Sequence, residues 1–245
     1  MILVEDLHRS FGATRAVDGV SFTARDGQIT GLLGANGAGK TTTLRMLYTL
    51  MRPDAGRILV DGIDAQQAPQ AVRRVLGVLP DARGLYRSLT ARENIEYYAA
   101  LQGLTPEHSR SRIDALVQTL AMQAIIERRT EGFSQGERLK TALARALVHD
   151  PRNVLLDEPT NGLDVMSTRS LRDFLRRLRS EGRCVLFSTH IMQEVAALCD
   201  HVVIIARGHV VAEGSPDALR AQAGEASLEE AFMKLIGAAA LEALA

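Results

Sequence analysis

The chain has 245 residues, of which 46% are hydrophobic, and its formal net charge is zero. A chain of this size can bury a substantial core, and its neutral charge disfavours nucleic-acid binding through bulk electrostatics. It has two cysteines without CxxC spacing and no histidine cluster, which disfavours a disulfide framework or structural metal. Its apolar runs are too short for a membrane span and no export signal opens it, so we expect a cytoplasmic protein.

Short apolar runs rich in β-branched residues recur along the chain. Those nearest the N-terminus lack intervening helices, which predicts an antiparallel β portion. Later runs alternate with helical stretches at 39–50, 164–180 and 190–199, which predicts an α/β fold with a mainly parallel sheet covered on both faces. The predicted strands are ILVEDL, VSFTA, QITGLL, RILVDG, VLGVLP, NVLLDEP, CVLFSTH and a hairpin in HVVIIARGHVVAEG that turns at Arg207 and Gly208.

The alternation of strands and helices stops between about residues 82 and 150, where we predict only helices. One begins at the capping box Thr90-x-x-Glu93, and another begins at Thr105 with Pro106 in its first turn. A last helix is predicted from Ser227. We therefore expect an α/β core at 1–81 and 151–223, a helical subdomain at 82–150 and a helical tail at 224–245.

The sequence GANGAGKT at 34–41 fits the phosphate-loop pattern GxxxxGK[ST] in full. Its glycines let backbone N–H groups turn inward, and the N-terminus of the following helix adds a positive dipole end. Lys40 supplies charge for the β- and γ-phosphates, and Thr41 offers a hydroxyl to Mg²⁺. The alternative is an ordinary glycine turn. The predicted nucleotide-binding residues here are Gly34, Ala35, Asn36, Gly37, Ala38, Gly39, Lys40, Thr41 and Thr42.

Two further predicted strands end in polar groups. NVLLDEP at 153–159 delivers Asp157 toward a metal's water shell and Glu158 to where an attacking water sits. CVLFSTH ends on His190, which we expect to touch a terminal phosphate. The alternative is that the two adjacent acidic residues are only polar residues of a turn, and that the histidine at the strand end has a structural role. The phosphate loop on the same sheet favours a catalytic role for Glu158 and His190 together with Lys40, and a metal-binding role for Asp157.

The stretch FSQGE at 133–137 supports two interpretations that can both hold. Ser134-x-x-Glu137 is a capping box that begins a helix. A serine and a glycine at a bare helix N-terminus also form an anion site. We therefore predict that Ser134, Gln135 and Gly136 contact a nucleotide.

Together with NGLD at 161–164, these motifs follow the order found in ABC transporters, and nearly the whole chain resembles their ATP-binding subunit. The resemblance implies a P-loop ATPase that uses ATP and Mg²⁺. It also implies that Phe11 stacks on adenine, although a phenylalanine there could equally be core. The stretches GLYRSLTARENIEYYAALQGL and SLEEAFMKLIG are most similar to the branch of sodium-extruding NatA subunits and drug exporters.

Two departures from the family pattern concern the site. FSQGE stands where LSGGQ is usual, with the serine and second glycine kept. Asp81 stands where the family usually has glutamine. A carboxylate at this position suits Mg²⁺, so we predict that Asp81 senses the metal. The alternative is that Asp81 only turns the chain after Pro80.

The resemblance also implies partners. Two copies pair so that the phosphate loop of one faces FSQGE of the other, and ATP-driven dimerisation powers export through a separate integral membrane permease. We expect a homodimer on the cytoplasmic face of the membrane, which it contacts only through the permease, and no nucleic acid. Leu85 and Tyr86 are predicted to dock the permease or to pack their own loop. The alternatives are a soluble ABC ATPase of translation or DNA repair, or a catalytically silent scaffold.

Overall fold

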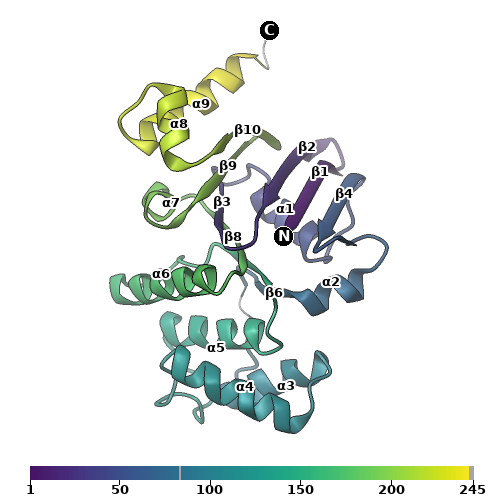
Figure 1. Cartoon of the computed structure of the whole chain (residues 1–245), viewed down its shortest axis with the longest axis vertical. Helices are drawn as coiled ribbons and strands as arrows, with labels where there is room; N and C mark the ends of the chain where they lie inside the picture. Colours follow the sequence, from purple (N-terminus) through teal and green to yellow (C-terminus); the bar gives the residue numbers. More distant parts are fainter. Residues whose placement is uncertain (83, 243–245) are drawn as a thin grey trace.

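The computed structural model describes residues 1–82 and 84–242, which form two β-sheets and the helices that cover them (Figure 1). The smaller sheet near the N-terminus has the order β2-β1-β4-β5, and its neighbouring strands are all antiparallel. This confirms the predicted antiparallel β portion. Its strands are β1 (Ile2–Phe11), β2 (Thr14–Ala24), β4 (Ala55–Val60) and β5 (Ile63–Asp64).

The larger sheet has the order β10-β9-β3-β8-β7-β6 and is parallel except for the edge strand β10. Strands β3, β7 and β8 are buried at every position, because helices or the smaller sheet cover both faces. The hairpin turns at Arg207 and Gly208 as predicted. The strands are β3 (Ile29–Leu33), β6 (Leu76–Leu79), β7 (Asn153–Asp157), β8 (Cys184–Thr189), β9 (His201–Ala206) and β10 (His209–Gly214).

The two faces of the larger sheet belong to different hydrophobic clusters, because side chains alternate along a strand. One face packs with α1 (Lys40–Leu47) and the smaller sheet, through residues such as Leu44 and Leu155. The other packs with α6 (Val165–Ser180) and the helices at the end of the molecule, through residues such as Phe174 and Phe187. The sheet is therefore the layer on which both halves of the core are built.

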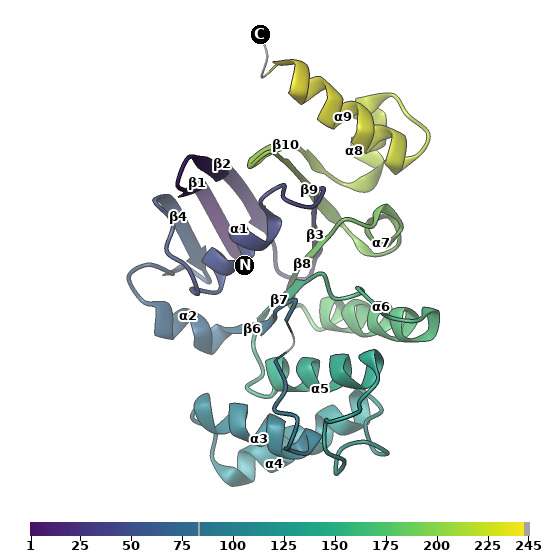
Figure 2. The same ribbon diagram turned by 180° about the vertical axis from the view of Figure 1, so that it is seen from behind.

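Helices α3 (Ala91–Leu101), α4 (Pro106–Thr119) and α5 (Gln135–Leu147) form one end of the molecule (Figures 1 and 2). Both predicted helix starts are confirmed: Thr90 and Glu93 form a reciprocal capping box, and Thr105 caps α4. Within residues 84–150 the structure has no strand, only an isolated bridge between Thr90 and Arg129. Buried residues of these helices belong to the same cluster as one face of the sheet.

Three helices cover other parts of the fold. α7 (Met192–Leu198) confirms the prediction at 190–199, whereas α2 (Pro69–Val75) and α8 (Pro216–Ala223) are not among the predicted helices. α2 is short and begins at Ala68 without a side-chain cap. α8 does carry a signal, because Ser215 accepts a hydrogen bond from the Ala218 N–H and Pro216 follows the cap.

The helical tail begins as predicted, since the Ser227 hydroxyl accepts a hydrogen bond from the Glu230 N–H at 3.1 Å. α9 (Leu228–Glu242) packs through Leu228 and Phe232 in a cluster that includes Leu219 of α8 and Ile204 of β9. Residues 243–245 of the predicted tail lie outside the described residues. In the described part of the chain, no helix is both long and apolar enough to cross a bilayer.

Candidate nucleotide site

The phosphate loop joins β3 to α1 and is packed closely on both sides. Gly39 caps α1 with φ of 110°, a conformation that side chains rarely adopt. A Cβ at Gly39 would lie 2.5 Å from the Ala16 carbonyl oxygen on β2, and one at Gly34 would lie 2.4 Å from the Ile205 carbonyl oxygen on β9. These two glycines are therefore needed because neighbouring backbone approaches them closely.

Lys40 lies buried at the centre of the loop, with 5% of its side chain exposed. Its ammonium donates hydrogen bonds to the carbonyl oxygens of Gly34 at 2.7 Å and Ala35 at 3.2 Å. The same nitrogen is 3.3 Å from a carboxylate oxygen of Glu158. Because the charge is held by the loop backbone, the ammonium is fixed where it can face an anion bound by the loop.

Asp157 ends β7 and shares one carboxylate oxygen between two hydroxyls. Thr41 Oγ1 donates to it at 3.2 Å, and Ser188 Oγ donates at 2.6 Å. Burial raises the pKa of the Asp157 carboxyl, although these two hydrogen bonds oppose the rise. The nearby carboxylates of Asp81 and Glu158 raise that pKa further, because like charges repel.

This donor set fits Mg²⁺. A threonine hydroxyl and a buried carboxylate lie in direct contact at the start of α1, and oxygen is the ligand that this ion prefers. A divalent cation would also relieve the repulsion among the clustered carboxylates. Mg²⁺ usually keeps several waters and takes phosphate oxygens as further ligands, so two protein groups suffice. Thr41 and Asp157 are the residues that would hold it.

Glu158 connects the phosphate loop to His190. Its side chain is 10% exposed, and one carboxylate oxygen lies 3.0 Å from His190 Nδ1 while the other pairs with Lys40. Its backbone is in the left-handed region at φ of 47°, and its N–H donates to Ser188 Oγ at 3.0 Å. Such strain in a non-glycine residue is typical of functional sites.

The residues predicted from three separate motifs therefore meet in one pocket. It is lined by side chains and backbone from the phosphate loop, from the end of β7 and from the residue after β8. Asp81, which follows β6, lines the same pocket. The lining residues are Ala16, Asn36, Gly37, Gly39, Lys40, Thr41, Thr42, Asp81, Glu158, Asn161 and His190.

Ser188 is a site residue that the sequence analysis missed. It is fully buried in β8 and holds both the Asp157 carboxylate and the Glu158 backbone through its hydroxyl. Its signal was present but weak: a serine inside an otherwise apolar strand, two residues before His190. A polar group in such a buried strand needs a hydrogen-bond partner, and the end of a neighbouring strand can supply it.

Phe11 ends β1 and is 47% exposed, which excludes the alternative that it belongs to the core. The Arg9 guanidinium lies 5.2 Å from the centre of its ring. An exposed ring remains available for stacking, so its contact with adenine stays a prediction.

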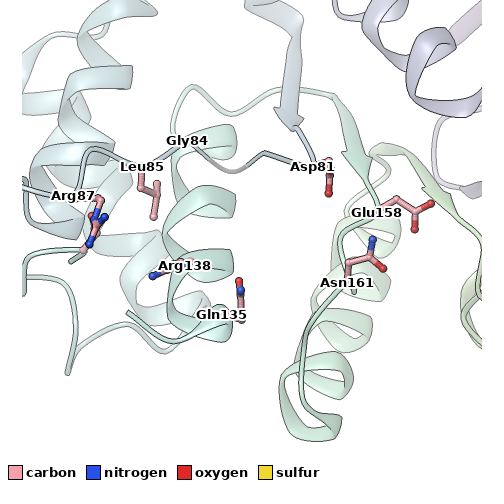
Figure 3. A pocket seen from close by; sticks show the side chains of 9 residues that line it. Asp81, Gly84, Leu85, Arg87, Gln135, Arg138, Glu158 and Asn161 are labelled. Atoms are coloured by element: carbon pink, nitrogen blue, oxygen red, sulfur yellow. The ribbon is translucent and has the colours of Figure 1, made fainter. Parts of the chain in front are cut away.

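The FSQGE stretch lies across a cleft from the carboxylates. Figure 3 shows Gln135 and Arg138 of α5 on one side of this cleft, and Asp81 and Glu158 on the other. Ser134 is exposed and caps α5, accepting a hydrogen bond from the Glu137 N–H at 3.2 Å. The predicted capping box is thus confirmed, whereas contact with a nucleotide stays a prediction.

Two side chains from outside this stretch lie against it. The Glu137 carboxylate pairs with Arg128 at 2.8 Å, and its pKa is lowered, first by the hydrogen bond from the Ser134 N–H. A Cβ at Gly136 would lie 2.7 Å from Ser167 Oγ of α6. A side chain at this position would therefore displace the Ser167 hydroxyl.

Comparison with known proteins gives a consistent result. Residues 17–161 match the family model described as ABC transporter. The chain is 43% identical to the ABC transporter ATP-binding protein NatA of Bacillus subtilis (strain 168), covering 95% of this chain and 97% of that protein. It is 36% identical to the daunorubicin resistance ATP-binding protein DrrA3 of Streptomyces coeruleorubidus, covering 91% and 71%.

A solved structure described as an ATP-binding subunit of an ABC transporter has the same fold. It superimposes with a TM-score of 0.88 at 30% identity and covers 96% of this chain and 99% of that one. The α/β P-loop fold predicted from the sequence is therefore confirmed, as is the similarity to NatA and to a relative named for drug resistance.

Proposed function

This chain belongs to the ABC transporter family as an ATP-binding, ATP-hydrolysing subunit, and from that premise we propose that it powers export through a separate integral membrane permease. The observation that carries the proposal is the pocket lined by Lys40, Glu158 and His190. Thr41 lines the same pocket and donates a hydrogen bond to the buried carboxylate of Asp157. The name of NatA, an ABC transporter ATP-binding protein that the chain matches along nearly its whole length, favours a transporter subunit over the soluble ABC ATPases of translation and DNA repair. The drug resistance in the name of DrrA3 supports the direction of export.

The residues of the pocket take distinct roles in this proposal. The loop N–H groups and Lys40 bind the phosphates, and Phe11 stacks on adenine. Thr41 and Asp157 would hold Mg²⁺, which would neutralise charge on the phosphates. Glu158 orients a water and accepts its proton as the water oxygen attacks the γ-phosphorus and ADP leaves.

His190 and Lys40 both contact Glu158, so they bracket the position of the attacking water. The Lys40 and His190 side chains approach this carboxylate at 3.3 Å and 3.0 Å on its two oxygens. We propose that a bound γ-phosphate replaces Glu158 as the partner of Lys40 and His190. Both side chains then donate hydrogen bonds to oxygens of the γ-phosphate. Glu158 is then free to act on water, which links binding of ATP to activation of the base.

ATP-binding subunits of this family dimerise and work with membrane permeases. We propose that this chain forms a homodimer in which Ser134, Gln135 and Gly136 of one copy complete the pocket of the other. The exposure of Ser134 supports this arrangement, because a capped helix N-terminus open to solvent can bind the γ-phosphate of a second copy.

Leu85 and Tyr86, the predicted permease contact, differ in their surroundings. Leu85 packs against the core cluster that contains the helical end, which favours the interpretation that it secures its own loop. Tyr86 is 47% exposed and stacks edge-on against Tyr97, with ring centres 5.3 Å apart. We propose Tyr86 as the permease contact, which would hold the chain at the cytoplasmic face of the membrane.

Co-purification tests the proposal most directly. The chain would be expressed with its membrane proteins, extracted in detergent and captured in the presence of ATP and Mg²⁺. We expect an integral membrane protein to co-purify and the captured complex to hydrolyse ATP. Purified chain that neither binds ATP nor retains a membrane protein would contradict the proposal.

A further inference from the structure

The turn between β9 and β10 holds the phosphate loop from outside the known motifs. The Gly208 N–H donates a hydrogen bond to the Ala38 carbonyl at 3.0 Å, inside the loop. The Gly208 carbonyl accepts one from the Asp18 N–H on β2 at 2.8 Å. One residue of the turn is therefore bonded to the loop on one side and to β2 on the other.

The same hairpin also contacts the first part of the loop. Ile205, at the end of β9, places its carbonyl oxygen 2.4 Å from a Cβ built at Gly34. At the other end, a Cβ built at Gly39 would lie 3.6 Å from the Gly208 Cα. Residues 34 and 39 delimit most of the loop, so one hairpin supports both of its ends.

Gly208 has little room for a side chain. Its φ is 85°, and a Cβ there would lie 3.1 Å from the Ala16 carbonyl oxygen and 3.4 Å from the Asp18 nitrogen. The Ala16 oxygen is also the atom closest to a Cβ built at Gly39. A side chain at position 208 that displaced the Ala16 carbonyl would therefore also disturb Gly39.

We propose that the β9–β10 turn is a positioning element for ATP and that Gly208 is its positioning residue. A phosphate loop binds its ligand through backbone N–H groups, whose directions depend on the backbone conformation. Support at both ends keeps those groups in place before the nucleotide arrives, which lowers the ordering cost of binding. This inference rests on the proposed function, because it assumes that ATP binds at this loop.

The chain offers a matched control for Gly208. The turn between β4 and β5 is also formed by two residues with positive φ, Asp61 at 50° and Gly62 at 78°, as Arg207 at 50° and Gly208 are. No atom in the described part of the chain lies within 4 Å of a Cβ built at Gly62. Gly62→Ala therefore imposes similar backbone strain without the contact with Ala16.

The experiment compares four variants with the wild type: Gly208→Ala, Gly208→Asn, Gly62→Ala and Gly62→Asn. Asparagine tolerates positive φ better than alanine but still carries a Cβ. The asparagine variant of Gly208 therefore keeps the contact with Ala16 and reduces the backbone strain. For each variant we would measure thermal unfolding, the affinity for a fluorescent ATP analogue, and kcat and KM for ATP.

We expect both Gly208 variants to raise the dissociation constant and KM about tenfold or more, which corresponds to about 1.4 kcal/mol. The Gly62 variants should show a comparable change in unfolding temperature with KM unchanged. A purely structural role would lower the fraction of active protein and leave KM unaltered. Wild-type KM in folded Gly208→Asn, or an equal rise in KM in Gly62→Asn, would overturn the inference.

Hydrogen–deuterium exchange of the wild type provides a test that needs no variant to fold. We expect ATP to slow exchange in a peptide covering 203–211 together with one covering the phosphate loop. Protection of the loop without any change in 203–211 would contradict the inference. If wild-type chain bound no ATP at all, the proposed function would fail instead.

Discussion

The phosphate loop and the FSQGE stretch are two glycine-containing helix starts that are built in different ways. The phosphate loop depends on residues far away in the sequence: Ala16, Ile205 and Gly208 fix its backbone. The FSQGE stretch is completed mainly by its own capping box between Ser134 and Glu137. One site is therefore shaped by tertiary contacts, and the other is shaped mostly by its local sequence.

This difference indicates how the two sites can work. The phosphate loop is anchored by buried residues at both ends and is preorganised, so it can bind ATP within one chain. The FSQGE stretch pairs its own helix-start N–H groups through the capping box and is exposed at Ser134, so it can meet a ligand that a second chain presents. Predictions that disturb one site and spare the other test whether this division holds.

The largest effect is expected for Lys40→Ala. It removes the ammonium that the loop backbone holds, and it leaves Glu158 without that partner. We expect ATP hydrolysis to fall at least about 100-fold and ATP binding to weaken, because a fixed charge at the phosphates is lost. Lys140→Ala is a suitable control, since Lys140 also donates to a backbone carbonyl, that of Ala121, but lies in α5. Near wild-type turnover in Lys40→Ala would exclude the assigned role of the loop.

Glu158→Gln should remove hydrolysis while retaining ATP binding. The amide keeps the shape of the side chain but accepts a proton poorly, so we expect turnover to fall about 100-fold or more. The bound ATP should then hold two chains together, which size-exclusion chromatography with ATP and Mg²⁺ would detect as a dimer. A monomer that nevertheless binds ATP would contradict the proposed division of the site between two chains.

Ser134→Ala tests the exposed site and has a close internal control. Ser134 and Thr90 both cap helices through capping boxes. The Ser134 hydroxyl accepts a hydrogen bond from the Glu137 N–H at 3.2 Å, and the Thr90 hydroxyl accepts one from the Glu93 N–H at 3.1 Å. Loss of either cap should lower the free energy of unfolding by about 1 kcal/mol. Only Ser134→Ala should also reduce ATPase activity and ATP-dependent dimerisation. If Thr90→Ala lost as much ATPase activity as Ser134→Ala, the loss in both variants would come from lower folding stability and not from a role of Ser134 at the nucleotide.

The smallest effect is expected for Asp81→Asn, which keeps the size and turn-forming ability of the residue. Asp81 lines the nucleotide pocket and its charge raises the pKa of Asp157. If Asp81 senses the metal, the variant should need a few-fold more Mg²⁺ for half-maximal ATPase activity. An unchanged Mg²⁺ dependence in folded protein would leave Asp81 as a turn residue after Pro80.

Features encoded within a few residues were predicted correctly from the sequence. The capping boxes at Thr90 and Ser134 and the hairpin turn at Arg207 were found because each depends on neighbours along the chain. The parallel sheet was also predicted, because buried strands have apolar runs separated by amphipathic helices. The order and spacing of the motifs identified the family and predicted residues that the fold brings together in one pocket.

Other features were decided by contacts between distant segments, which no local pattern specifies. Gly34 and Gly39 must be glycine because strands β9 and β2 press against them, and Ser188 joins the site because β8 lies beside β7. The short helix α2 has no cap that marks its start and packs Val72 into the core. The sequence by itself predicted which side chains meet at the pocket. Tertiary packing decided how they are held, because a backbone contact depends on where the fold brings two strands together.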